Sequence, residues 1–276
     1  MTPLQPPAPD SLPAPAAAPR RELRAITLAD PLRWLARGAR DLRAAPGISL
    51  FYGLCFWGMA LLLGAVFRRM PEYTVSFVSG CFLLGPFLAM GLYEVSRRHE
   101  QGVAQDFAGS LTCWDRHLGS MGLLVLVLTL LELLWGRASL VVFAVFFDTG
   151  MPTTASVLQA VFNPRNWQFV TAYALVGGVF AALVFSTCVV SIPMILDRDT
   201  DAISAGIASI QAVAGRTAPL LLWGALIVAL LAGAMLLPWA VGVLLVGPWL
   251  GHASWHAYRG CFAWDTAHGG APGPIP

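Results

Sequence analysis

The sequence contains few charged residues. Charged side chains make up 12% of its 276 residues, about half the usual share, whereas hydrophobic side chains make up 57%. It contains no lysine, so all 17 basic residues are arginine. So few charges cannot cover the surface of a water-soluble domain of this length. The composition therefore excludes a soluble protein and predicts an integral membrane protein.

Motifs for catalysis and nucleotide binding are also missing. The sequence has no Walker loop, no G-x-G-x-x-G, no nucleophile elbow and no zinc-protease motif. The net charge of +2 is too small to indicate a nucleic-acid partner. Its cysteines form no C-x-x-C pair, and most of them lie in or beside apolar runs, where cysteine packs as a small hydrophobe; they are Cys55, Cys81, Cys113, Cys188 and Cys261. These absences favour a protein that is not an enzyme and carries no cofactor.

Both ends of the chain differ from the middle. Residues 1–25 are rich in proline and alanine and are predicted to be a disordered cytoplasmic tail. Residues 262–276 are predicted to be a short cytoplasmic tail. After the first tail, residues 30–43 combine apolar positions with four arginines behind an Asp-Pro start. This pattern predicts an amphipathic helix in the headgroup region, its arginines toward phosphate. The alternative is a cytoplasmic helix packed on other loops.

Long uncharged runs predict the membrane spans, since about 20 apolar residues cross the hydrocarbon core. The predicted fold is an all-α, polytopic membrane helical bundle over residues 26–261. Its six predicted spans cover residues 48–67, 73–93, 118–147, 167–196, 217–237 and 239–258.

The arginines predict the orientation of the spans. Thirteen lie in segments that six spans place on one side, and four lie on the other. By the positive-inside rule both termini are predicted to be cytoplasmic, in a bacterial inner membrane.

The middle hairpin is predicted to be longer than the other two. Its spans, residues 118–147 and 167–196, each run thirty residues, more than the hydrocarbon core requires. We expect their outer turns to project, to pack on each other and to be covered by residues 151–162. The alternative breaks the third span near Gly136 and Arg137.

An internal repeat relates the second and sixth spans. Residues 83–98 and 245–260 share five identical positions in sixteen, including the pairs Pro86/Pro248 and Arg97/Arg259. Helical hairpins one and three are therefore predicted to be parallel copies. Pro86, Pro193 and Pro248 are candidate helix kinks, since proline removes a helical hydrogen bond. Small-residue stripes in the last two spans predict close helix packing, within the chain or across a homo-oligomer.

Glu132 is the one carboxylate well inside a predicted span. A charge at the centre of a membrane helix costs about 2.5–3.5 kcal/mol, so such residues usually face protein and mark a function or a pair. Arg137 lies about 140° around the helix from it and need not be its partner. The alternative is a neutral, protonated Glu132, because burial disfavours the charged form of a carboxyl group.

Other polar candidates gather at the inner helix ends. His252 and His256 share one helix face, the spacing of two ligands for one metal ion. The alternative is that they hydrogen-bond to neighbours or headgroups. Three helix ends each present an ionisable group beside an arginine, which predicts either interfacial anchoring or a shared polar vestibule; these groups are Glu94 with Arg97, His256 with Arg259, and Asp197 with Arg198.

Four stretches resemble a bacterial integral-membrane family catalogued as domain of unknown function 2189. They are Asp30–Trp34, Leu84–Arg97, Ser191–Arg198 and Gly251–Arg259, and the resemblance covers roughly residues 26–261. It implies a polytopic inner-membrane protein without an established activity, and some members carry labels as putative cytochrome c oxidase components. A catalytic oxidase subunit is not supported, because only His252 and His256 lie within a span.

Three functions follow as hypotheses. The first is a non-enzymatic protein that binds or assembles partners, with a respiratory membrane complex as one candidate. The second is a small transporter or lipid-handling protein, favoured by the repeat and its prolines. The third is a metal or haem protein that uses His252 and His256.

Overall fold

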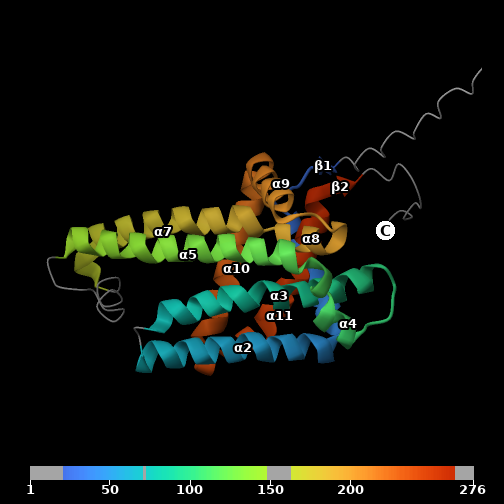
Figure 1. Ribbon diagram of the computed structural model, residues 1–276, viewed down its shortest axis with the longest axis horizontal. Helices are drawn as coiled ribbons and strands as arrows, with labels where there is room; N and C mark the ends of the chain where they lie inside the picture. The colour runs from blue at the N-terminus through green and yellow to red at the C-terminus, as the bar shows by residue number, and fades with distance from the viewer. Residues whose placement is uncertain (1–20, 71–72, 148–162, 265–276) are drawn as a thin grey trace, which may run out of the picture.

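The computed structural model describes residues 21–70, 73–147 and 163–264. Helices make up nearly all of these residues, and Figure 1 shows the long helices side by side along one axis. The all-α membrane bundle is therefore confirmed. Among the described residues, five helical segments are long and apolar enough to cross a membrane; they are Pro46–Arg69, Phe77–Glu100, Phe107–Phe146, Trp167–Arg198 and Thr217–Leu236. The sixth span stays a prediction.

A two-stranded ribbon brings the two ends of the described chain together. Strand β1 (Arg21–Leu23) pairs antiparallel with β2 (Phe262–Trp264), and Leu23 lies opposite Phe262. Both strands lie in stretches that were predicted to be tails. The rest of those stretches, residues 1–20 and 265–276, lies outside the described residues. Below, the end of the bundle that carries this ribbon is called the ribbon end.

Helix α1 (Asp30–Ala44) packs its apolar face on the bundle. Trp34 is buried edge-on against Trp223, with ring centroids 5.7 Å apart. The indole Nε1 of Trp249 donates a hydrogen bond to the backbone oxygen of Leu35 at 2.8 Å. The buried side of this amphipathic helix therefore contacts protein, and its exposed side carries the arginines.

Helices α2 (Pro46–Arg69) and α3 (Thr74–Glu100) form the first hairpin. Pro86 lies inside α3, which continues through it as one helix. At the ribbon end the short helix α4 (Phe107–Thr112) and the 3-10 turn η2 (Asp115–His117) lead into the second hairpin.

Helix α5 (Leu118–Phe146) is continuous over 29 residues, so the alternative break near Arg137 is wrong. After η3 (Pro164–Asn166), α7 (Trp167–Cys188) returns beside it. Figure 1 shows α5 and α7 extending past the ends of α2 and α3. Their outer turns pack on each other as expected, since the rings of Phe143 and Phe169 are buried 5.9 Å apart. The predicted cover, residues 151–162, lies outside the described residues.

The fourth predicted span is two helices, not one of thirty residues. Helix α7 ends at Cys188, and α8 (Ser191–Arg198) starts after a two-residue step. Pro193 supplies the reason, because a proline cannot donate to the carbonyl four residues earlier, and its ring clashes with it. That carbonyl belongs to Val189, in the step itself. Pro193 therefore ends α7 rather than kinking a continuous helix.

Helix α9 (Ala202–Gly215) was not predicted. Its N-cap is Asp201, whose carboxylate accepts a hydrogen bond from the backbone of Ser204 at 2.9 Å. Small residues form its buried face, and they are Ala202, Ala205, Gly206, Ala208, Ser209 and Ala212. At 14 residues it is about 21 Å long, too short to cross the hydrocarbon core.

Helices α10 (Thr217–Leu236) and α11 (Val243–Cys261) complete the bundle, joined through the 3-10 turn η4 (Pro238–Ala240). Helix α11 packs closely on its neighbours: a Cβ at Gly53 of α2 would lie 2.1 Å from the Leu244 oxygen, and one at Gly251 would lie 2.5 Å from Leu92 of α3. Pro248 lies inside α11 as Pro86 lies inside α3. Superposition of the two hairpins stays a prediction.

Candidate functional site

A large cavity lies inside the bundle. Its volume is about 1060 Å³, and α3, α5, α7, α8, α10 and α11 all contribute to its walls. It follows α7 from Tyr173 to Cys188, about 22 Å at 1.5 Å per residue. That length is roughly two thirds of a hydrocarbon core about 30 Å thick. The cavity is therefore large and long enough to hold an elongated small molecule within the membrane.

Glu132 is the buried charged group of this cavity. It lies near the middle of the 29-residue helix α5, and only 8% of its surface is exposed. The hydroxyl of Ser79 on α3 donates a hydrogen bond to its Oε2 at 2.7 Å. Among the described residues Glu132 has no ion pair, and Arg137 does not neutralise it. One hydroxyl is thus its only hydrogen-bond partner in the described part of the chain.

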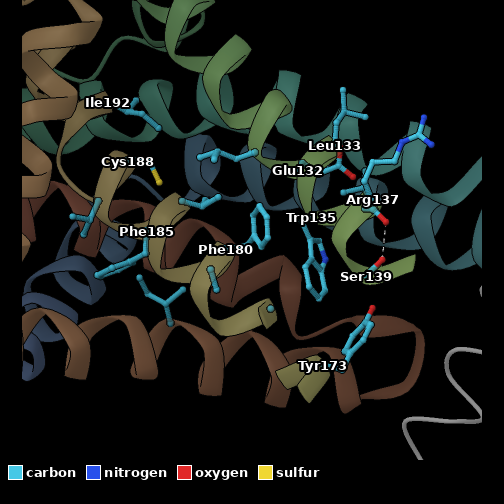
Figure 2. A pocket seen from close by; sticks show the side chains of 18 of the residues that line it. Glu132, Leu133, Trp135, Arg137, Ser139, Tyr173, Phe180, Phe185, Cys188 and Ile192 are labelled. Carbon is cyan, nitrogen blue, oxygen red and sulfur yellow. Dashed lines mark hydrogen bonds between the residues drawn. The ribbon is translucent and has the colours of Figure 1, made fainter. Parts of the chain in front are cut away.

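Aromatic rings line the cavity beside this carboxylate. Trp135 packs edge-on against Tyr173, with centroids 5.1 Å apart, and lies 5.8 Å from Phe180. Phe185 and Trp223 continue the lining toward the ribbon end. Figure 2 shows Trp135, Phe180 and Tyr173 on one side of Glu132, with the Arg137 side chain directed away from them. The cavity therefore places one carboxylate beside an aromatic wall.

A cluster of buried polar side chains lies outside the cavity, where α1, α3 and α11 meet. Asp41 of α1 is 4% exposed and accepts two hydrogen bonds through its carboxylate oxygens. His99 Nδ1 lies 2.6 Å from Oδ1, and His256 Nε2 lies 2.8 Å from Oδ2. Because an ionised carboxylate only accepts hydrogen bonds, both ring nitrogens carry protons here. Asp41 therefore joins α1 to two other helices.

Further hydrogen bonds extend this cluster of polar side chains to His252. Ser96 bonds to Asp41, and its hydroxyl lies 2.8 Å from His252 Nδ1. The Ser49 hydroxyl of α2 lies 2.9 Å from Nε2 of the same ring. Because a neutral imidazole has one N–H and one bare ring nitrogen, one of these two hydroxyls accepts from His252 and the other donates to it. This chain of bonds, called the histidine–aspartate network below, satisfies both nitrogens of a fully buried histidine.

The network keeps Asp41 ionised. Burial opposes the charge and raises the pKa of Asp41. The hydrogen bond and charge of His256, with hydrogen bonds from Ser96 and His99, outweigh that effect and hold the pKa below its ordinary 3.8. Such a fully bonded network acts as a structural joint between α1, α2, α3 and α11.

The predicted metal-ligand role of His252 and His256 has no support in this geometry. His252 bonds two serines, while His256 bonds Asp41. In residues 21–70, 73–147 and 163–264, no group of three or more histidine, cysteine or acidic side chains is placed to hold a metal ion.

The remaining polar candidates meet at the ribbon end. Glu94 is buried between Arg97, whose Nη2 lies 2.6 Å from its Oε2, and Arg98, whose Nε lies 2.9 Å from its Oε1. Arg259 of α11 lies 3.1 Å from Glu100 of α3 and 3.8 Å from Asp197 of α8.

The Asp197 carboxylate also lies 3.3 Å from Arg198, and it accepts a hydrogen bond from Tyr258 at 2.7 Å. The structure thus brings Asp197, Arg198 and Arg259 together, while Glu94 pairs within its own helix.

Sequence reasoning missed Asp41, Ser96 and Glu100. A signal for Asp41 was available, because it follows Trp34 and Gly38 on the apolar face of α1 at spacings of four and three. A carboxylate on the buried face of an amphipathic helix needs a partner.

Comparison with known proteins gives one result that bears on identity. No curated protein and no solved structure matches the chain. The sequence matches a protein-family model over residues 74–197, and the family is described as a predicted integral membrane protein (DUF2189). The match contains Leu84–Arg97, whereas Asp30–Trp34 and Gly251–Arg259 lie outside it. The resemblance seen in the sequence is therefore confirmed over residues 74–197: there the chain is similar to the integral membrane family DUF2189.

Proposed function

We propose that this integral membrane protein binds a hydrophobic or amphiphilic molecule from the bilayer, as a lipid-handling protein or small transporter would. The observation that carries the proposal is the cavity of about 1060 Å³ along α5 and α7. Ligand sites are concave and mostly apolar, with a few polar groups that fix orientation. This cavity has that character, with Glu132, Ser139 and Tyr173 among its apolar walls.

Two neighbouring glycines of α7 offer a matched test. A Cβ at Gly177 would lie 3.0 Å from the Trp135 ring that lines the cavity. Gly178 faces open space, with nothing within 4 Å of such a Cβ. A leucine at position 177 therefore reaches the cavity, while the same change at position 178 does not.

The experiment is photolabelling with a phospholipid that carries a diazirine in its acyl chain, on protein in nanodiscs. Mass spectrometry should map the crosslinks to the cavity residues Trp135, Phe180 and Cys188. Gly177→Leu should lower this labelling at least about fivefold, and Gly178→Leu should leave it unchanged. Labelling spread evenly over the lipid-facing helix surfaces, or equal in both variants, would contradict the proposal.

The partner-binding hypothesis, including a link to a respiratory complex, stays a prediction from the sequence. Purification in mild detergent tests it, because an assembly protein should carry a reproducible partner. The same preparation tests the metal or haem hypothesis through an optical spectrum and metal analysis. The bacterial inner membrane and the cytoplasmic termini are likewise proposals, tested by reporter fusions after Arg98, Arg216, Arg69 and Arg165.

A further inference from the structure

The charge of the cavity identifies a narrower ligand class. Among the described residues that line the cavity, only Glu132 and Arg137 are charged. Arg137 is exposed, and Figure 2 shows its side chain directed away from the aromatic wall. Glu132 is buried, and within the described part of the chain its hydrogen-bond partner is Ser79. The buried part of the cavity therefore carries a single negative charge when Glu132 is ionised.

An isolated carboxylate at this depth is costly to keep. Such a group in a membrane helix is usually paired or functional, and the described residues supply no cation to pair with it. The same chain neutralises Glu94 with Arg97 and Arg98 at 2.6 and 2.9 Å. A bound ligand with a positive charge would give Glu132 the cationic partner that the described residues do not supply.

The aromatic wall favours the same charge. The face of an aromatic ring attracts a cation within about 6 Å, most strongly for tryptophan, and the attraction grows when water is excluded. Trp135, Tyr173 and Phe180 stand together beside Glu132. A carboxylate beside partly buried aromatic rings, in a mostly apolar cavity, is suited to an organic cation whose substituents are hydrophobic.

We infer that the cavity binds lipophilic organic cations, with Glu132 as the counter-ion and Trp135, Tyr173 and Phe180 as the aromatic wall. This inference rests on the proposed function, since it names the ligand class of the same cavity. A neutral or anionic amphiphile would occupy the apolar walls without using Glu132.

A pair of probes of one shape and opposite charge tests the inference. Tetraphenylphosphonium and tetraphenylborate are compared by equilibrium dialysis against the full chain in detergent micelles, with empty micelles as the blank. The wild type should bind the cation more tightly than the anion. Glu132→Gln should weaken cation binding at least about tenfold, because the attraction of opposite charges in a low-dielectric site is lost.

Two further variants complete the test: one is a control for the charge change, and the other tests the aromatic wall. Glu22→Gln makes the same chemical change on an exposed residue of β1 and should leave cation binding unchanged. Trp135→Leu removes a ring without touching the charge and should weaken cation binding several-fold. The circular-dichroism spectrum of each variant checks that it remains folded.

The outcomes separate the inference from the proposed function. Equal binding of both probes, or cation binding that Glu132→Gln leaves unchanged, would overturn the inference. If diazirine lipid still labelled the cavity in that case, the proposed function would stand without it. Absence of both probe binding and cavity labelling would overturn the two together.

Discussion

The cavity and the histidine–aspartate network each contain a buried carboxylate, but the two carboxylates differ in the number of hydrogen bonds that they receive. Asp41 in the network is buried and receives hydrogen bonds from two histidines and a serine. Glu132 in the cavity is also buried, and among the described residues it receives one hydrogen bond, from Ser79. The carboxylate of Glu132 also lines a cavity of about 1060 Å³. The difference supports the proposal that Asp41 stabilises the fold and that Glu132 takes part in ligand binding.

The largest expected effect comes from removing the centre of the network. Asp41→Ala leaves His99 and His256 without their acceptor and should lower the free energy of unfolding by about 3 kcal/mol, as for one partner lost from a buried pair. Unfolding in SDS, followed by circular dichroism, measures it. A change below about 0.5 kcal/mol would show that the network does not stabilise the fold.

A smaller loss is expected further along the same network. Ser96→Ala leaves Nδ1 of the fully buried His252 without its hydrogen-bond partner and should cost about 1–2 kcal/mol. The half-buried Ser186, whose hydroxyl donates to the Leu183 backbone oxygen of its own helix, provides the control. Equal unfolding midpoints for Ser96→Ala and Ser186→Ala would contradict this role.

Replacing the carboxylate of the cavity should raise the free energy of unfolding rather than lower it. Glu132→Leu removes a costly buried acid and should raise the free energy of unfolding by roughly 1 kcal/mol, as expected at a site where function is held at the expense of stability. The same SDS titration measures it. If the variant instead loses as much stability as Asp41→Ala, Glu132 belongs to the folding framework and the comparison fails.

The smallest effect should appear only in acid. The folded-state pKa of Asp41 is below 3.8, so its charge contributes stability above that value, and the contribution is lost as the pH falls through the folded pKa. The titratable groups that face it are His99 of α3 and His256 of α11.

Asp41→Asn, which does not titrate, gives the reference for this effect. The difference in unfolding free energy between wild type and Asp41→Asn should hold from about pH 6 to about pH 4.5 and shrink below about pH 4. A difference that stays constant to about pH 3 would mean that folding does not lower the pKa of Asp41.

Sequence patterns predicted the parts of this molecule that depend on local chemistry. Uncharged runs located the helices of the bundle, and the alternation of apolar and arginine residues located α1. Continuous hydropathy hid the break at Val189, where Pro193 outweighs the apolar run. Helix α9 was missed because its 14 residues are too few for a span, although Asp201 marks its start.

Contacts between residues that are far apart in the sequence could not be predicted in the same way. Asp41 and His256 are 215 positions apart, and no local pattern connects them. Glu132 stood out because its cost depends only on its depth in a span, whereas its neighbours Ser79 and Tyr173 come from other helices. The cavity itself results from how six helices pack, which composition does not reveal.

The most direct test of the central claim is the rise in unfolding temperature that saturating tetraphenylphosphonium produces in three proteins. A ligand that binds only the folded state stabilises it by an amount that grows with the logarithm of its concentration divided by its Kd. We predict the same rise in wild type and in Asp41→Asn, the latter from a lower starting temperature, and a clearly smaller rise in Glu132→Gln at the same ligand concentration. An equal rise in all three proteins, or a rise that Asp41→Asn loses and Glu132→Gln keeps, would contradict the account.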